Sequence, residues 1–252
     1  MPAKRILILG GTGEARQLAA LLVNAGHDVM TFLAGATEHP VLPEGKVQIG
    51  GMGGVLGLKQ YIVSESIEIL IDATHPFAGG ISLIAYYASI DIETVTLLRL
   101  ERAEWQKQKD DIWIEVDSVK SAVEALPLGS RIMLTIGRKW IEPFMARSDL
   151  SGLVRMIEAP SVDIPQSWRL VRERPPFSVE GEMTLMIDNN ISHIVSKNSG
   201  GAETESKIVA ARKLKIPVVM ISRPNTVKVS SFGQPEEIAF AVSKLGSDAM
   251  SG

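Results

Sequence analysis

The stretch that decides the fold spans residues 6–15 and reads ILILGGTGEA. Its first four residues are apolar, as expected for a strand that is buried on both faces of a parallel sheet. After the glycines, apolar residues recur at the spacing i, i+3, i+4, i+7, which predicts a helix. These residues are Ala15, Leu18, Ala19 and Leu22, and Gly26 stands where the helix is expected to end. A buried strand, a glycine turn and a helix in this order are typical of a sheet covered by helices.

The same alternation continues along the chain and predicts an α/β protein with two Rossmann-like domains, each a parallel sheet flanked by helices. In the first half, further strands are predicted at residues 29–33, 47–49, 67–71 and 94–98. In the second half, strands are predicted at 113–116, 131–136, 153–157, 170–172, 194–196 and 218–221, and helices at 119–126, 179–188 and 203–214.

A polar run at residues 106–111 interrupts the apolar rhythm. We therefore predict an N-terminal domain over residues 1–105 and a C-terminal domain over residues 106–252. The last strand of the first domain could instead belong to the second. The tail from Gly246 onward is expected to be frayed.

Composition excludes several classes of protein. The 252 residues include no cysteine, which rules out disulfides, thiolate metal sites and cysteine nucleophiles and fits a reducing cytoplasm. We expect no resident metal. A net charge of −3 gives no reason to expect nucleic-acid binding. The apolar runs are far shorter than the roughly 20 residues that span a bilayer, so no membrane segment is expected.

The glycine turn predicts a dinucleotide site on the first domain. Glycines at this point allow backbone N–H groups to approach a pyrophosphate at the positive end of a helix. The predicted contacts are Gly10, Gly11, Thr12, Gly13, Glu14 and Ala15. The spacing is closer to the G-x-x-G pattern of short-chain reductases than to G-x-G-x-x-G. The alternative is a tight turn without a ligand.

The end of the second predicted strand should contact the adenosine ribose. An acidic residue there favours NAD and an arginine favours NADP, but this chain has Ala34, Gly35, Ala36 and Thr37. Arg16 and Thr37 are the nearest candidate partners for a 2′-phosphate, and both could instead be solvated surface residues.

Two further strand ends of the first half complete the predicted cofactor site. A glycine cluster follows the third strand, and from it we assign Gly51, Gly53 and Gly54 to the cofactor, with a flexible loop as the alternative. The fourth strand runs into DATHPFA at residues 72–78. Ala73 and Thr74 are predicted cofactor contacts, Asp72 is expected to orient the loop, and His75 is a candidate catalytic residue or a structural histidine.

In the second half, basic residues follow one predicted strand after another, which predicts a site for an anionic ligand. Scattered surface charges are the alternative. The predicted ligand contacts are Arg138, Arg172, Asn198, Ser199, Gly200 and Arg223, and Lys197 is a second candidate catalytic residue.

Taken together, these segments resemble the precorrin-6A reductase family over nearly the whole chain. The resemblance is carried by the glycine turn, the 50–54 glycine cluster and DATHPFA in the first half, and by TIGR at 135–138 and SKNSGGA at 196–202 in the second. It implies a nicotinamide cofactor on the first domain and substrate in the cleft between the two. Many relatives have an arginine where this chain has Ala36. The resemblance implies NADPH as the cofactor, with NADH as the alternative, and the absence of that arginine predicts weak discrimination between the two.

The family's substrate is a tetrapyrrole with acetate and propionate arms, precorrin-6A or cobalt-precorrin-6A, and such a polyanion would account for the basic strand ends. The resemblance implies hydride transfer near Thr74 and His75 to one carbon of a ring double bond. The adjacent carbon then takes a proton from His75, Lys197 or water. The sequence leaves the oligomeric state and the presence of cobalt open.

Two other functions would explain part of this sequence. A generic short-chain reductase usually has a Tyr-x-x-x-Lys pair, but the residues four positions after Tyr61, Tyr86 and Tyr87 are not lysines; they are Glu65, Ile90 and Asp91. A dinucleotide-sensing regulator would bind cofactor without turnover and would leave the basic strand ends unexplained.

Overall fold

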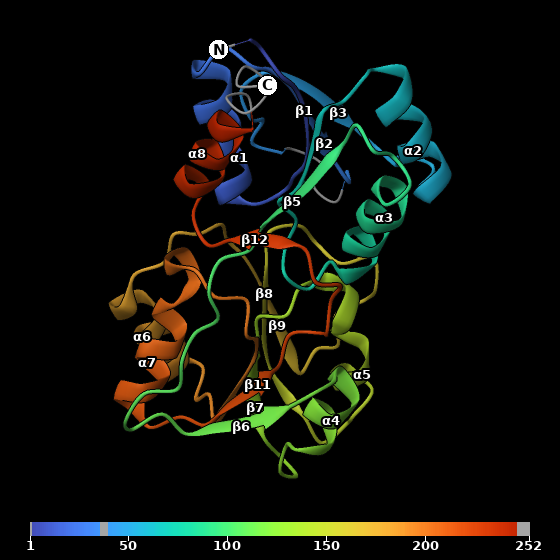
Figure 1. Ribbon diagram of the computed structural model, residues 1–252. Coiled ribbons are helices and arrows are strands. Elements are labelled where there is room, and N and C mark those ends of the chain that lie inside the picture. The colour runs from blue at the N-terminus through green and yellow to red at the C-terminus, as the bar shows by residue number, and fades with distance from the viewer. Residues whose placement is uncertain (1, 36–39, 246–252) are drawn as a thin grey trace. The chain divides into compact units, whose positions relative to one another are not determined.

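The computed structural model describes residues 2–35 and 40–245. The chain forms two units (Figure 1). Unit 1 combines Met1–Arg102 with Asn225–Gly252, and unit 2 is the intervening segment Ala103–Pro224.

Unit 1 is built on a six-stranded parallel sheet with the order β12-β5-β4-β1-β2-β3. The strands are β1 (Arg5–Leu9), β2 (Asp28–Leu33), β3 (Lys46–Ile49), β4 (Ile69–Asp72), β5 (Thr96–Leu100) and β12 (Ser230–Phe232). The helices are α1 (Gly13–Asn24), α2 (Gly54–Ser64), α3 (Gly79–Ser89) and α8 (Pro235–Lys244). This is the Rossmann order, in which the strand order reverses between β1 and β4.

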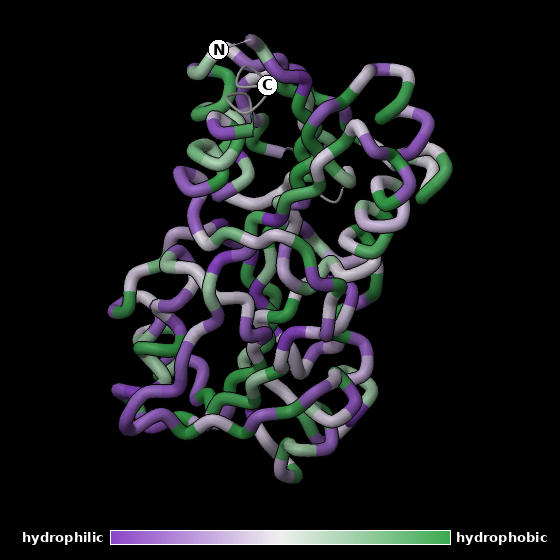
Figure 2. Tube along the Cα trace, in the orientation of Figure 1, coloured by the Kyte–Doolittle hydropathy of each residue, from purple (hydrophilic) through white to green (hydrophobic). Residues whose placement is uncertain are grey.

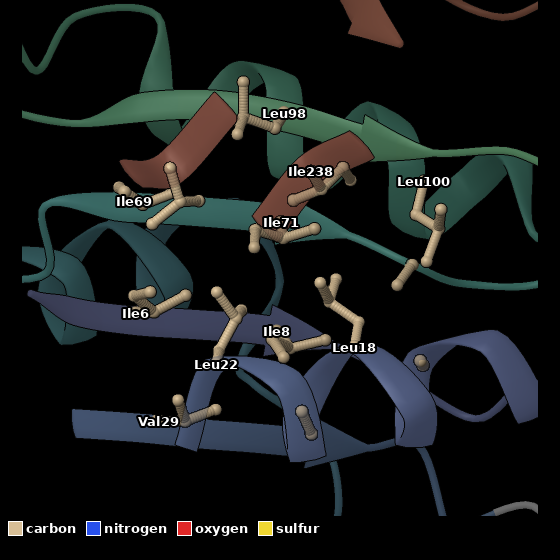
Figure 3. Packing of buried hydrophobic residues seen from close by; sticks show 14 residues of the cluster. Ile6, Ile8, Leu18, Leu22, Val29, Ile69, Ile71, Leu98, Leu100 and Ile238 are labelled. Atoms are coloured by element: carbon tan, nitrogen blue, oxygen red, sulfur yellow. The ribbon is translucent and has the colours of Figure 1, made fainter. Parts of the chain in front are cut away.

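The sheet of unit 1 is buried on both faces, which explains the unbroken apolar run of β1. Ile6 and Ile8 pack on the face covered by α1 and α8, and Leu7 and Leu9 pack on the face covered by α2 and α3. Figure 3 shows Ile238 of α8 between Leu98 and Ile71 in the first of these clusters. The strands in the interior of the sheet are correspondingly hydrophobic in Figure 2.

Unit 2 repeats the architecture, with the strand order β6-β11-β10-β7-β8-β9, again all parallel. The strands are β6 (Trp113–Val116), β7 (Arg131–Leu134), β8 (Ser151–Met156), β9 (Trp168–Arg172), β10 (His193–Lys197) and β11 (Val218–Ile221). The helices are α4 (Val119–Glu124), α5 (Glu142–Met145), α6 (Val179–Asp188) and α7 (Ser206–Leu214), with 3₁₀ turns η1 (Arg138–Trp140) and η2 (Ala202–Thr204). Its reversal point lies between β7 and β10. The predicted pair of Rossmann-like parallel sheets is therefore confirmed.

The outer strand next to β5 in unit 1 and next to β11 in unit 2 comes from opposite ends of the two units in the sequence. We call this difference the exchange of the outer strand. In unit 2 this position beside β11 is taken by β6, the first strand of the unit. In unit 1 the corresponding position beside β5 is taken by β12, which comes after unit 2 (Figure 1). The two sheets thus have the same spatial order but differ in which end of the unit supplies the outer strand.

This exchange differs from the predicted division at residue 105, in which everything after it formed the second domain. Segment 225–245 returns to unit 1 because β12 pairs with β5, while Ile238 and Val242 of α8 are buried in the unit 1 core. The first crossing, after Arg102, lies three residues before the predicted boundary at residue 105, and β5 belongs to the first sheet. The tail from Gly246 lies outside the described residues.

Most predicted elements are present with shifted ends. The strand predicted at 94–98 is β5, Thr96–Leu100, and the helix predicted at 203–214 begins at Ser206 after a 3₁₀ turn. Four helices and the short strand β12 were not predicted: α2, α3, α5 and α8. In the described part of the chain, no helix combines the length and the apolar character needed to cross a membrane.

Candidate active site

The glycine loop after β1 lies at the reversal point of the first sheet. Gly10 donates its N–H to the Phe32 carbonyl at 2.9 Å, and a Cβ on Gly10 would lie 2.8 Å from the Thr31 methyl carbon. Gly10 is therefore required for packing against β2. Gly11 has φ of +124° and nothing within 4 Å of an added Cβ, so its backbone is open on the exposed side of the turn.

The first turn of α1 continues this site. Thr12 caps the helix, because its Oγ1 accepts from the Ala15 N–H at 3.0 Å, and the same hydroxyl donates to the Ala73 carbonyl at 3.1 Å. One side chain therefore joins the loops that follow β1 and β4. An exposed glycine followed by a helix N-terminus fits the pyrophosphate of a dinucleotide.

Glu14 adds a carboxylate to that first turn. Nη1 of Arg102 donates to both of its oxygens, at 2.8 and 2.9 Å. Burial alone would raise the pKa of the Glu14 carboxyl, but hydrogen bonding by its own backbone N–H and the charge of Arg102 outweigh burial and hold that pKa below its usual value. Glu14 is therefore ionised and ion-paired at neutral pH.

The loop after β4 is held by a buried ion pair. Asp72 accepts from the Thr74 hydroxyl at 2.7 Å, and its other oxygen lies 3.2 Å from Nε and from Nη2 of Arg99. Arg99 also donates to the Thr226 hydroxyl at 2.8 Å, on the segment that returns to unit 1. Asp72 thus orients the loop, as expected from the sequence. The partner Arg99 was missed, although it shares the strand-end position of the other basic residues.

His75 is exposed at the tip of this loop. Its Nδ1 accepts from the Phe77 N–H at 3.2 Å, which places the proton of a neutral ring on Nε2. Thr74, His75 and Arg99 line a small hollow at this strand end. The structure thus brings Gly10–Ala15, Ala73, Thr74 and His75 to one edge of the first sheet.

Of the remaining predicted cofactor contacts, Arg16 lies on α1 and the others follow β2 and β3. Ala34 and Gly35 are exposed after β2, whereas Ala36 and Thr37 lie outside the described residues. Gly51 and Gly53 are exposed before α2, and Gly54 is exposed as its first residue. The left-handed φ of Gly53, +70°, belongs to the N-cap of that helix. Arg16 is partly exposed on α1.

In unit 2, the ends of the neighbouring strands β7 and β10 bring a basic cluster together. Lys197 Nζ lies 5.1 Å from the ring centroid of Trp140, a residue of η1 together with Arg138 and Lys139. Burial, followed by the charge of Lys139, lowers the pKa of Lys197 to about 8. Arg138, the residue before Lys139, is exposed. The predicted convergence of Arg138 and Lys197 at one sheet edge is therefore present.

The loop that follows Lys197 is occupied with contacts inside unit 2. Asn198 accepts from the Trp105 N–H at 2.9 Å and donates to the Trp105 carbonyl at 3.2 Å. A Cβ on Gly200 would lie 1.9 Å from the Ala103 carbonyl oxygen. The segment entering unit 2 thus passes directly against this loop.

Arg223 fastens the same loop from the other side. Its guanidinium donates to the carbonyls of Asn198 and Ser199, both at 3.0 Å, and lies 3.5 Å from Glu104. Arg223 and Asn198 thus hold parts of the chain together, and their assignment to a substrate stays a prediction. Their partners Trp105 and Glu104 were not predicted.

Arg172 does not join the cluster. It ends β9, which is separated from β10 by β7 and β8, and it forms an ion pair of 3.7 Å with Glu158. Within the described residues, no group of three or more histidine, aspartate and glutamate side chains is arranged to hold a metal ion.

Comparison with known proteins identifies the family. A family model described as precorrin-6x reductase CbiJ/CobK matches residues 5–243. Precorrin-6A reductase of Rhodococcus erythropolis is 44% identical, over 87% of this chain and 89% of the relative. Precorrin-6A reductase of Rhodobacter capsulatus is 40% identical, over 87% and 88%. Cobalt-precorrin-6A reductase of Priestia megaterium is 27% identical, over 94% and 97%.

A solved structure agrees with the sequence relatives. The structure titled CobK precorrin-6A reductase superposes with a TM-score of 0.91 at 38% identity, covering 96% of this chain and 97% of the other. Because the match extends over both Rossmann-like sheets, the chain belongs to the precorrin-6x reductase CbiJ/CobK family, oxidoreductases of cobalamin biosynthesis.

Proposed function

We propose that this chain reduces one ring double bond of precorrin-6A, with NADPH or NADH bound to unit 1 and the carboxylate arms of the tetrapyrrole bound to unit 2. The observation that carries the cofactor assignment is the exposed Gly11 backbone, placed before α1 at the reversal point of a sheet with the Rossmann order. When bound, the reduced nicotinamide supplies the hydride.

Within unit 1, the chain's own groups prepare this site. Thr12 fixes the first loop to the second through the Ala73 carbonyl, and the Asp72–Arg99 pair fixes Thr74. These contacts hold the two strand-end loops in a set geometry before any ligand arrives, which reduces the entropy lost on binding.

We assign the proton donor to Lys197 in preference to His75. A general acid works best when its pKa lies close to the working pH, and the pKa of Lys197 is lowered to about 8. Nδ1 of His75 is already used as an acceptor for Phe77. In this assignment Lys197 holds a proton at Nζ and gives it to the ring carbon next to the one that accepts hydride.

The carboxylate arms are assigned to the basic groups beside Lys197. Arg138 and Lys139 are exposed on η1, immediately after β7. A substrate carboxylate bound to either residue would also weaken the repulsion between the positive charges of Lys139 and Lys197. Ser199 and Gly200 shape the adjoining loop, and Arg172 is left to the outer edge of the sheet.

We further propose that the substrate is metal-free. Relatives named precorrin-6A reductase, from four genera, share 39–44% identity with the chain, whereas three relatives named cobalt-precorrin-6A reductase share 24–27%. Weak discrimination between NADPH and NADH stays a prediction that rests on Ala36.

The test is a steady-state assay at the nicotinamide absorbance with each cofactor and each macrocycle. We expect oxidation of NADPH or NADH that depends on added precorrin-6A, with a lower kcat/KM for the cobalt form. Cofactor binding without oxidation in the presence of precorrin-6A would instead support a dinucleotide-sensing regulator.

A further inference from the structure

We propose that Arg102 is a positioning residue of the cofactor site, which acts by neutralising Glu14 so that the glycine loop can accept an anion. The inference rests on the proposed function, because it concerns the same dinucleotide site. Arg102 is the last residue of the first segment of unit 1 and lies outside the glycine loop.

Glu14 stands at the place where a pyrophosphate is expected. It is the second residue of α1, next to the exposed Gly11 turn. A carboxylate in the first turn of a helix interacts favourably with the positive helix end. Without compensation, an ionised Glu14 would therefore compete with a phosphate for that end and would also repel it.

Arg102 removes both effects. The side chains of Arg102 and Glu14 are 18% and 26% exposed, so solvent screens the pair less than it screens a surface pair. Both carboxylate oxygens are engaged by the same guanidinium nitrogen. The pair carries no net charge, so the helix end remains available for an anion.

Another ion pair of unit 1 lies away from the glycine loop. Lys4 and Glu68 form an ion pair of 2.8 Å. They directly precede β1 and β4, so the pair lies at the other end of these strands from the glycine loop. Its side chains are 20% and 40% exposed, which makes it a matched control of similar geometry away from the glycine loop.

The experiment is a double-mutant cycle read out by NADPH binding, using fluorescence titration without substrate at low and high salt. We expect Arg102→Met to weaken NADPH binding about tenfold at low salt, because the unpaired Glu14 carboxylate then repels the phosphates of NADPH. The loss should be smaller at high salt, since salt screens this repulsion. The double variant Glu14→Gln/Arg102→Met should return to within about threefold of the wild type, since the carboxylate charge is gone.

Further variants keep the test decisive. Arg102→Lys retains the charge and should stay within about threefold of the wild type, as should the control Lys4→Met. Glu14→Gln alone completes the cycle and should bind NADPH at least as tightly as the wild type, because the anionic ligand then meets Arg102 without a competing carboxylate. The thermal midpoint of each ligand-free variant shows whether it is folded. A double variant as weak as Arg102→Met would overturn the proposal, because Arg102 would then be needed independently of Glu14.

Failure of this proposal is distinguishable from failure of the proposed function. If the wild type binds NADPH and Arg102→Met binds it equally well, only the role of Arg102 is overturned. If the wild type binds neither NADPH nor NADH, the cofactor assignment and the role of Arg102 are both overturned.

Discussion

At the scale of single residues, identical amino acids serve different purposes. Gly11 and Gly200 both have positive φ, +124° and +65°. An added Cβ would meet nothing within 4 Å at Gly11, but it would meet the Ala103 carbonyl at 1.9 Å at Gly200. Gly11 therefore leaves space for a ligand, whereas Gly200 allows two segments of unit 2 to touch.

This contrast gives the first prediction. Gly11→Val should abolish NADPH binding, because its side chain fills the approach to the backbone, while the fold is retained at a cost of about 1–2 kcal/mol for the unfavourable φ. The matched control is Gly129→Val, with φ of +71° and the same open surroundings before β7. It should lower the thermal midpoint similarly and leave NADPH affinity intact. Equal NADPH affinity in wild type and Gly11→Val would contradict the loop assignment.

The second prediction concerns the pH dependence of catalysis. Because Lys197 must be protonated to act as an acid, and its pKa is lowered to about 8, kcat/KM should be high below pH 8 and fall as pH rises through that value. Lys197→Met should lose this limb together with most of kcat. His75→Gln should retain it.

A variant of Lys139 tests whether Lys197 is the group that titrates. Lys139 contributes to the lowered pKa of Lys197 through its positive charge. Lys139→Met should therefore move the alkaline limb to higher pH. A limb that stays in place in Lys197→Met shows that another group titrates.

The candidate site could be predicted only where residue type and strand end coincide. Gly10–Ala15, Thr74 and Lys197 follow strands that the apolar runs reveal. Arg223 follows a strand in the same way, yet its guanidinium holds the carbonyls of Asn198 and Ser199. A sequence does not distinguish a cation that meets a ligand from one that meets the chain's own carbonyls, because both occupy the same position.

At the scale of elements, α8 illustrates how a distant segment becomes part of a core. Ile238 and Val242 are 0% and 1% exposed and pack with Leu18 of α1 and Ile71 of β4 (Figure 3). The helix begins with a capping box, in which Gln234 and Glu237 exchange side-chain and backbone contacts. Its N-terminus is thereby satisfied locally, while its apolar face depends on unit 1.

The third prediction follows from this packing. Ile238→Ala should lower the free energy of unfolding by about 2–5 kcal/mol, the range for truncating a buried aliphatic side chain. Phe240→Ala on the same helix is the control, since that ring is 65% exposed and should cost under about 0.5 kcal/mol. Denaturant titration of both variants measures the difference. Equal effects would mean that α8 does not pack as described.

Elements with long apolar runs were predictable, and the others were not. The last four residues of β1 are buried, alternately on the two faces of the sheet, so their pattern is unambiguous. The strand β12 has only three residues, two of them serines, and its position is fixed by pairing with β5 instead of by its own composition. Such an edge strand has no sequence signal of its own.

At the scale of the whole molecule, the two units differ in continuity. Unit 2 is one uninterrupted segment that contains every strand of its sheet, β6 to β11. Unit 1 needs two segments, because β12 and α8 follow unit 2.

The fourth prediction uses this asymmetry. A fragment of residues 103–224 should fold alone and unfold cooperatively in a thermal melt followed by circular dichroism. A fragment of residues 1–102 should not, because β5 would present an unpaired edge and α1 would expose the surface that Ile238 covers. Adding residues 225–252 through a short linker after Arg102 should restore folding. A cooperative melt of 1–102 alone would contradict this account.

The exchanged outer strand also has a consequence for synthesis on the ribosome. Chains generally fold from the N-terminus as they emerge, at roughly 5–20 residues per second. Here β1 to β5 emerge first but remain without β12 until unit 2 has been translated, a delay on the order of 10 s at those rates. The half that starts first is thus finished last, and in the interval its open β5 edge is the surface that a chaperone would meet.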